Sequence, residues 1–183
     1  MNDAELRAAL REHAYLEGDF VLRSGKRSRY YLDKFRFETR PDTLAALGQR
    51  IAEEVDEQAG DVDRLAAPQL GAIVLAAAAS LASGRPFLIV RDAPKGYGTR
   101  NRIEGAFEPG ESVCLIEDVV TTAGALLEAV DAVRAAGLVV ETAICVIDRE
   151  EGGFEALARR DITLRSLFKA SEIVHKTPAK PHG

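Results

Sequence analysis

The sequence predicts an α/β fold, with a mostly parallel sheet flanked by helices. Short apolar runs alternate with longer segments of helical periodicity from residue 64 to residue 168, as expected for parallel strands joined by helical crossovers. The chain has 183 residues, 46% of them hydrophobic and 29% charged, which suits one well-buried domain. We therefore expect a single domain over residues 1–183, with a small hood at residues 1–40 and a flexible tail at residues 170–183.

The hood is predicted from a helix and a hairpin. Residues 3–14 place apolar side chains among charges at helical spacing, and Gly18 is expected to end this helix. Residues 19–33 then indicate two strands around a Ser-Gly-Lys turn. Cations gather in this region beside two tyrosines, and a hairpin with solvated charges is the alternative to a binding role. These cations are Arg23, Lys26, Arg27, Arg29, Lys34 and Arg36.

The elements of the body follow in order, and Gly or Pro marks several of their boundaries. The predicted helices cover residues 43–58, 72–84, 125–136 and 154–160. The predicted strands cover residues 64–68, 86–91, 113–116, 139–147 and 162–168. Residues 91–105 contain cations and glycines without packing periodicity, and long loops of this kind in compact domains are usually functional.

The chain is organised around residues 113–125. A buried strand there is expected to end at Glu117 and Asp118, and a turn of small residues from Thr121 to Gly124 leads into a helix. Backbone N–H groups in such a turn can approach a phosphate, and the helix dipole favours its negative charge. The carboxylates would repel that phosphate but suit neighbouring hydroxyls or a hydrated Mg²⁺. The arrangement indicates a ligand such as a ribose 5-phosphate.

Residues 113–125 closely resemble the signature motif of phosphoribosyltransferases, the enzymes that use 5-phosphoribosyl 1-diphosphate. The resemblance implies that Glu117 and Asp118 contact the ribose hydroxyls and that the next residues hold the 5-phosphate. This phosphate loop comprises Val119, Val120, Thr121, Thr122, Ala123, Gly124 and Ala125. Ala123 stands where the motif usually has Gly, and it is strained if the position needs a positive φ. The alternative is an ordinary strand-to-helix turn with solvated acidic residues.

Further motifs, in the same order, resemble orotate phosphoribosyltransferases over about the first 170 residues. Arg23 falls where that family has a lysine that reaches the diphosphate and the orotate. Tyr30 and Tyr31 fall at the aromatic pair of its base pocket. Arg149 matches the arginine that fixes the orotate carboxylate and ring carbonyl, and a planar bidentate donor suits a planar anion.

The turn at residues 69–72 resembles the diphosphate-binding turn of the same family. Ala67 and Ala72 stand where that turn usually has Gly. A tight strand-to-helix connection without a ligand is an equally good interpretation of this stretch taken alone.

Residues 91–105 resemble the family's mobile loop, which closes over the bound diphosphate. Arg91 and Lys95 match two of its basic positions. Asp92 replaces a further lysine, and Tyr97 replaces a histidine, so two usual cation or proton donors are absent. We expect Tyr97 still to contact the substrate.

The implied reaction is Mg²⁺-dependent transfer of phosphoribosyl from 5-phosphoribosyl 1-diphosphate to orotate, which gives orotidine 5′-phosphate and diphosphate in pyrimidine (UMP) biosynthesis. The resemblance assigns catalytic roles to Arg91, Lys95 and Asp118, and no dedicated metal ligands are predicted. It also implies a homodimer with shared active sites, in which the mobile loop reaches the neighbouring subunit.

Other features limit partners and location. A net charge of −5 argues against a nucleic-acid partner, and no apolar run reaches membrane-spanning length. The charged, helix-like start favours a cytoplasmic protein, and Cys114 and Cys145 lie in apolar runs typical of buried reduced thiols. Two other functions remain open: a phosphoribosyltransferase for a purine or another pyrimidine, and a non-catalytic sensor of 5-phosphoribosyl 1-diphosphate.

Overall fold

The computed structural model describes residues 1–21, 25, 27–93 and 102–174. Its main sheet has the strand order β5-β4-β3-β6-β7-β8. Every neighbouring pair is parallel except β4 and β5, which are antiparallel. The predicted mostly parallel sheet is thus confirmed. The strands are β3 (Arg64–Pro68), β4 (Phe87–Val90), β5 (Ile103–Glu104), β6 (Ser112–Val120), β7 (Val139–Asp148) and β8 (Thr163–Lys169).

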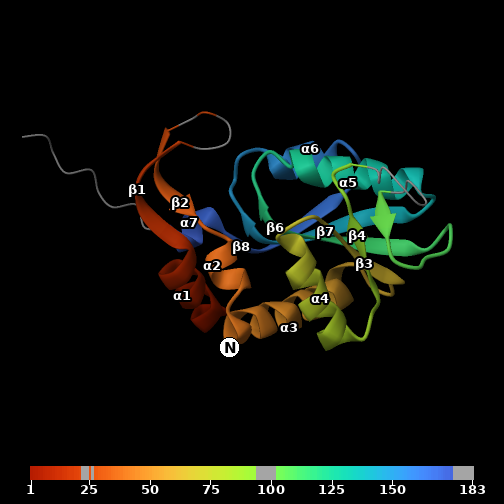
Figure 1. Ribbon diagram of the computed structural model, residues 1–183, viewed down its shortest axis with the longest axis horizontal. Coiled ribbons are helices and arrows are strands. Elements are labelled where there is room, and N and C mark those ends of the chain that lie inside the picture. Colours follow the sequence, from red (N-terminus) through yellow and green to blue (C-terminus); the bar gives the residue numbers. More distant parts are fainter. Residues whose placement is uncertain (22–24, 26, 94–101, 175–183) are drawn as a thin grey trace, which may run out of the picture.

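Helices cover both faces of this sheet (Figure 1). On one face lie α3 (Pro41–Gln58) and α4 (Ala72–Ser83), and on the other lie α5 (Gly124–Ala135) and α6 (Gly153–Ala158). Successive side chains of a strand point to opposite faces. In β3, Leu65 and Ala67 therefore join the core beneath α3 and α4, whereas Ala66 joins the core beneath α5.

Both cysteines are buried within the sheet. Cys114 lies in β6 and Cys145 in β7, and both are free thiols with no exposed surface. Burial raises the pKa of the Cys114 thiol to about 12, and it also raises the pKa of Cys145. The prediction of buried reduced thiols is confirmed.

The N-terminal segment, predicted to be a hood and called the hood below, contains two helices and two strands. It consists of α1 (Asp3–Ala14), an antiparallel pair of strands β1 (Tyr15–Val21) and β2 (Arg27–Leu32), and α2 (Phe35–Glu38). The prediction that Gly18 ends the first helix is wrong, because the helix ends at Ala14 and Gly18 lies within β1. The Phe20 ring lies close beside Gly18, so the glycine accommodates an aromatic neighbour in the strand.

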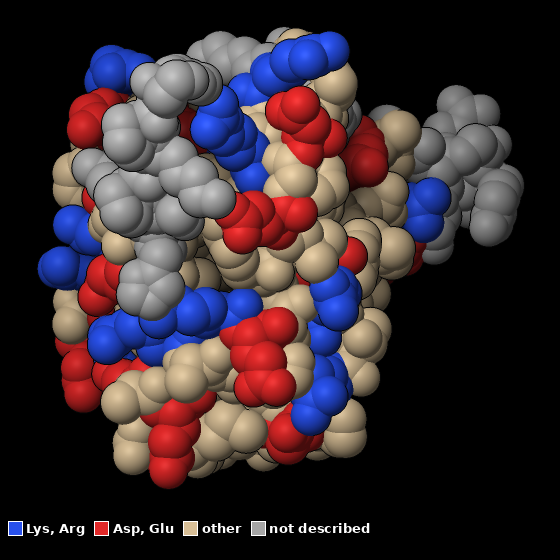
Figure 2. Space-filling model, turned by 90° about the vertical axis from the view of Figure 1, so that its left-hand side faces the viewer, with Lys and Arg blue, Asp and Glu red and all other residues tan. Residues whose placement is uncertain are grey.

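The molecular face that carries the hood mixes the two signs of charge. Acidic and basic side chains lie interspersed over it (Figure 2). This arrangement agrees with the modest net charge of −5 and differs from the clustered basic surface of nucleic-acid-binding proteins. Among the described residues, the helices are too short or too polar to span a membrane.

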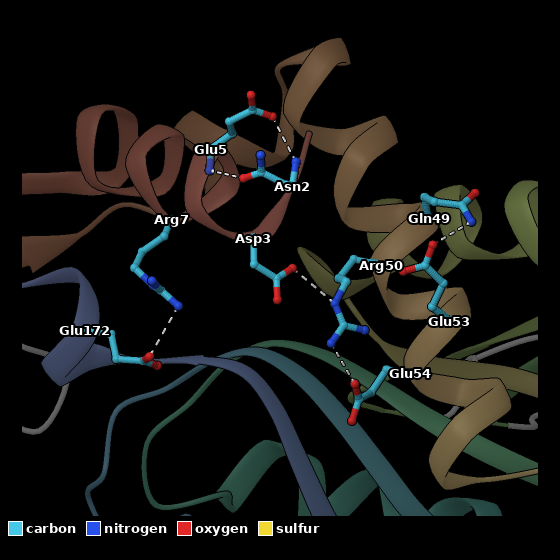
Figure 3. Close-up of polar contacts among 9 residues, drawn as sticks. All are labelled: Asn2, Asp3, Glu5, Arg7, Gln49, Arg50, Glu53, Glu54 and Glu172. Atoms are coloured by element: carbon cyan, nitrogen blue, oxygen red, sulfur yellow. Dashed lines mark hydrogen bonds and ion pairs between the residues drawn. The ribbon is translucent and has the colours of Figure 1, made fainter.

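Helix α1 is closed at its start by a capping box. The Asn2 side chain accepts a hydrogen bond from the Glu5 N–H at 2.9 Å, and the Glu5 carboxylate accepts one from the Asn2 N–H at 2.9 Å (Figure 3). These bonds satisfy two N–H groups that a helix start otherwise leaves without partners. On the inner face, Leu6 and Leu10 are almost fully buried. This burial supplies most of the attachment of α1 to the body.

Ion pairs then fix the direction of α1 (Figure 3). Arg50 of α3 bridges Asp3 at 3.3 Å and Glu54 at 3.1 Å, and Arg7 reaches Glu172 at 3.4 Å. Such partly exposed pairs contribute little free energy each, but they join α1 to two separate elements. These contacts attach α1 to α3 and α7.

Glu172 belongs to a helix that the sequence did not predict, α7 (Ala170–Ile173). Ala170 and Ile173 are buried, so the segment expected to be a tail from residue 170 begins with four residues that pack against the hood. Residues 175–183 lie outside the described part of the chain.

Candidate active site

The acidic pair lies inside the sheet. The prediction that the strand ends before Glu117 is wrong, because β6 continues through Asp118 and pairs with β7 as far as Val120 and Asp148. Glu117 is 8% exposed and Asp118 is 2% exposed. Ionising two adjacent buried carboxyl groups costs free energy unless other groups compensate their charge. Packing alone therefore does not account for this end of the strand.

A lysine from the hood supplies one partner. Lys34, which precedes α2, donates from Nζ to Asp118 Oδ2 at 2.6 Å. The other carboxylate oxygen of Asp118 accepts a hydrogen bond from the Val119 N–H at 2.6 Å, and Glu117 Oε1 accepts one from the Asp118 N–H at 3.0 Å. Asp118 is thereby held with both oxygens engaged.

A third carboxyl group, that of Glu38, completes this cluster. Glu38 is 1% exposed, and neither of its carboxylate oxygens has a hydrogen-bond donor within the described residues. A Cβ atom at Gly71 would overlap Asp118 Oδ2 and lie 3.0 Å from both Glu38 Oε2 and Lys34 Nζ. Because Gly71 has no side chain, α2, β6 and the turn before α4 can pack closely together at this point.

The environment changes the protonation of these groups. Burial, with the Asp118 carboxylate adding to it, raises the pKa of both Glu38 and Glu117 to about 8. Burial opposes the charge on Lys34, but Asp118, Glu117 and Glu38 favour it, and the pKa of Lys34 is raised. At neutral pH these shifts favour the protonated forms of Glu38 and Glu117 and the charged form of Lys34.

The raised pKa of Glu38 predicts how stability depends on pH. Between about pH 5 and pH 8 the folded chain keeps a proton that the unfolded chain releases, so stability is full below this range and falls as pH rises through it. Glu38→Gln should reduce the fall in unfolding free energy from pH 5 to pH 8 by on the order of 1 to 3 kcal/mol. Urea unfolding of parent and variant at both pH values measures it. Equal falls in the two proteins would contradict the assignment.

The phosphate loop follows directly. Thr121 is half-buried, Thr122, Gly124 and Ala125 are exposed, and the loop leads into the start of α5. Ala123 is buried and has φ 64°, so the position does require the left-handed conformation that the motif's glycine adopts at lower cost. The loop presents backbone and hydroxyl groups at the positive end of a helix, as an anion site requires.

A close approach of the next loop supports this one. A Cβ atom at Gly153 would lie 2.5 Å from Val120 Cγ1 and 2.6 Å from the Thr121 carbonyl oxygen. The Arg149 N–H also donates to the Val120 carbonyl at 2.8 Å. The ends of β6 and β7 are thus fixed side by side, which brings the segment at residues 148–153 to the same edge as the acidic pair.

Arg149 and Tyr30 line a cavity of about 600 Å³ between the hood and this edge. The Arg149 guanidinium lies 5.3 Å from the centre of the Tyr30 ring, and the Tyr15 ring stacks on Tyr30 at 5.9 Å. Arg149 Nη2 also contacts Glu151 Oε1 at 2.8 Å, and its side chain is only 8% exposed. A buried cation over an aromatic face can hold a flat anionic ring.

Tyr31 does not line that cavity. Successive residues of a strand point to opposite sides, and Tyr31 is 42% exposed with its ring 5.6 Å from that of Phe20. The structure therefore separates the two tyrosines that the sequence grouped together.

The loop predicted to cover the diphosphate is described only at its ends. Arg91 Nη1 lies 3.7 Å from Glu104 Oε1, and the Arg91 N–H donates to the Arg102 carbonyl at 2.8 Å. Asp92 accepts a hydrogen bond from Gln69 Nε2 at 3.1 Å, which joins this loop to the predicted diphosphate turn. The predicted site residues Arg23, Lys95 and Tyr97 lie outside the described residues.

Two residues of the cluster were not singled out from the sequence. Lys34 was grouped with the other hood cations, and Glu38 was not selected. Their helix is four residues long, too short for its periodicity to indicate which side chains turn inward. The sequence signal that could have found Glu38 is its apolar neighbour Phe37, which the structure buries.

Comparison with known proteins decides the family. An orotate phosphoribosyltransferase of Methanocella arvoryzae is 48% identical over 177 residues, which cover 96% of this chain and 99% of that protein. The chain belongs to the orotate phosphoribosyltransferase family. It is thus a member of a transferase family of pyrimidine biosynthesis. No protein-family model matches the chain.

Solved orotate phosphoribosyltransferases share the fold. The Mycobacterium tuberculosis enzyme in complex with Fe(III) dicitrate has a TM-score of 0.84 at 30% identity and covers 94% of this chain and 99% of its own. The same enzyme in complex with 5-phospho-α-D-ribosyl 1-diphosphate has a TM-score of 0.79 at 29% identity and covers 93% and 98%. Curated relatives of the chain carry the orotate phosphoribosyltransferase name. They therefore favour neither a phosphoribosyltransferase for another base nor a non-catalytic sensor.

Proposed function

We propose that this chain transfers phosphoribosyl from 5-phosphoribosyl 1-diphosphate to orotate in the presence of Mg²⁺. The observation that carries the proposal is the meeting of three features at one edge of the sheet: the acidic end of β6, the phosphate loop, and the cavity lined by Arg149 and Tyr30. Ligands of open α/β sheets bind at the carboxyl ends of the strands. The family of the chain supports the same reading.

The ribosyl diphosphate is proposed to bind along β6 and the loop after it. Asp118 and Glu117 would accept hydrogen bonds from the ribose hydroxyls, and the loop before α5 would hold the 5-phosphate. The solved relative bound to 5-phospho-α-D-ribosyl 1-diphosphate supports this choice of ligand. The proposed phosphate contacts come from Val119, Val120, Thr121, Thr122, Ala123, Gly124 and Ala125.

The base is proposed to lie in the cavity between hood and sheet. Arg149 would donate to the orotate carboxylate and ring carbonyl, while Tyr30 covers the face of the ring. Two parallel N–H donors from a rigid fork match a planar anion. Purines lack that carboxylate and would leave the buried guanidinium without its acceptor.

Glu117 and Asp118 suit a magnesium ion that binds to the protein together with the ribosyl diphosphate. Within the described ranges, groups of three or more His, Cys, Asp or Glu side chains that could hold a metal are absent. Mg²⁺ commonly keeps its waters and binds substrate phosphates with help from one or two carboxylates, and Glu117 and Asp118 could face its water shell. When bound, the ion would neutralise charge on the diphosphate.

The chemistry needs stabilisation of charge rather than a protein nucleophile. The bond from C1′ to diphosphate breaks, C1′ becomes oxocarbenium-like, and an orotate nitrogen forms the new bond. Preorganised cations at the leaving group and exclusion of water lower that barrier. Arg91 and Lys95 are proposed to supply such cations, with Asp118 holding the ribose in register; Tyr97 and Arg23 are proposed as further contacts.

A turnover assay with orotate, 5-phosphoribosyl 1-diphosphate and Mg²⁺ tests the proposal. Orotidine 5′-phosphate and diphosphate should form in equal amounts, and a panel of purines and pyrimidines should react much more slowly. Turnover of another base in preference to orotate would identify a different phosphoribosyltransferase. Tight binding of the ribosyl diphosphate without turnover of any base would identify a sensor.

We also propose a homodimer in which the loop at residues 91–105 completes the neighbour's site. Lys95→Ala disables the loop, and Asp118→Asn disables the body. When the two inactive variants are mixed and allowed to exchange subunits, about half the dimers become hybrids with one intact site of two, so about a quarter of parental activity should return. If the loop serves its own subunit, every site carries a lesion and activity should stay at that of the inputs.

A further inference from the structure

Lys34 lies at the junction of three elements that carry the proposed site. It directly precedes α2, its ammonium contacts Asp118 of β6 at 2.6 Å, and a Cβ atom at Gly71 would lie 3.0 Å from its Nζ. Gly71 precedes α4, in the turn that resembles a diphosphate-binding turn. Lys34 thus places a cation between the Asp118 carboxylate and the turn before α4.

The turn itself lacks a cation. Residues 69–72 are Gln, Leu, Gly and Ala, and Gln69 bonds to Asp92 rather than to a basic residue. The start of the twelve-residue helix α4 favours an anion, but a diphosphate carries several negative charges. A cation next to this turn would add to the charges already proposed for the leaving group in balancing them.

The ammonium of Lys34 is suited to that task. An ammonium has three N–H donors, and Asp118 takes one of them. The Lys34 side chain is 33% exposed whereas that of Asp118 is 3% exposed, so Lys34 can face an incoming anion without leaving its carboxylate. Buried Glu38, whose carboxyl oxygens have no donor within the described residues, lies at the same junction. The contact with Asp118 favours the charged ammonium of Lys34.

We propose that Lys34 is a further substrate-binding residue, which bridges Asp118 and the diphosphate group of the ribosyl donor. This inference rests on the proposed function. It assigns to the hood a contact with the leaving group in addition to its role as a wall of the base cavity.

Two fragments of the substrate separate a diphosphate contact from an effect on the ribose. Inorganic diphosphate with Mg²⁺ probes the leaving-group side, and ribose 5-phosphate probes Asp118 and the phosphate loop. Calorimetric titration of Lys34→Met should show diphosphate binding weakened by about tenfold or more, with ribose 5-phosphate affinity changed by less than about threefold. Arg36→Met is the matched control, because Arg36 is an exposed cation of the same helix; it should leave both affinities unchanged.

A second comparison covers the case in which Lys34→Met unfolds because Asp118 is left without its partner. In an Asp118→Asn background the same lysine substitution leaves no orphaned carboxylate at position 118, and diphosphate affinity should again fall about tenfold. Unchanged diphosphate affinity in both backgrounds would overturn the proposal, as would an equal loss for ribose 5-phosphate. Parental turnover of orotate is measured separately, so a wrong base assignment cannot be mistaken for a wrong role of Lys34.

Discussion

Arg149→Ala is expected to lower kcat/KM for orotate by about 30- to 1000-fold, which corresponds to about 2 to 4 kcal/mol of transition-state binding. The reason is that the Arg149 side chain is 8% exposed and lies against the Tyr30 ring. Replacing a charge-assisted bidentate contact with water costs free energy at a buried position of this kind. The KM for 5-phosphoribosyl 1-diphosphate should change much less, because the diphosphate substrate is proposed to bind along β6.

Initial rates with each substrate varied in turn measure this effect. Arg159→Ala is a suitable control, since Arg159 is an exposed arginine just after α6, and it should leave both constants unchanged. An Arg149→Lys variant keeps the charge but loses the planar fork, so it should recover only part of the activity. Parental use of orotate by Arg149→Ala would show that another residue recognises the base.

Asp118→Asn is expected to reduce kcat/KM for 5-phosphoribosyl 1-diphosphate by about 30- to 300-fold. The substitution keeps the shape of the side chain but removes the charged acceptor proposed for the ribose hydroxyls. It also leaves Lys34 without its partner at 2.6 Å. Because Asp118 is buried, we expect the unfolding free energy to fall as well, by about 1 to 3 kcal/mol, and the variant should still fold.

Calorimetric titration with the ribosyl diphosphate and Mg²⁺, together with urea unfolding, tests both parts. Asp131→Asn provides a matched control, because Asp131 is an exposed carboxylate of α5 and its loss should affect neither binding nor stability appreciably. Undiminished affinity and turnover in Asp118→Asn would remove the acidic pair from the proposed ribose site.

The sequence alone determined the layered architecture. Buried apolar runs such as β6 and β7 are hydrophobic on both faces, which is the pattern of a parallel sheet covered by helices, and the structure has that sheet. The sequence also predicted at which edge of the sheet the proposed site lies, since the residues after consecutive parallel strands meet at one side. The sequence therefore predicted Glu117 and Arg149 on the same edge of the sheet.

Local conformation follows residue type at two turns. Ala123, which the sequence marked as strained if its position needs a positive φ, has φ 64°. Gly137 follows α5 with φ 85°, a conformation common for a glycine after a helix. The range predicted for the first helix, residues 3–14, matches α1. Gly18 was wrongly taken as its terminator, because pairing of β1 with β2 starts directly at Tyr15. Tertiary pairing overrode a local signal there.

Only the tertiary structure decided the environment of the acidic pair. The sequence shows two carboxylates after an apolar run. Whether they face solvent depends on how far β6 pairs with β7 and on which segment covers the end of β6. The hood brings Lys34 and Glu38 across 84 and 80 residues of chain to Asp118. Local periodicity carries no information on such distant contacts, and for that reason the sequence predicted a surface edge where the fold builds a buried, charged junction.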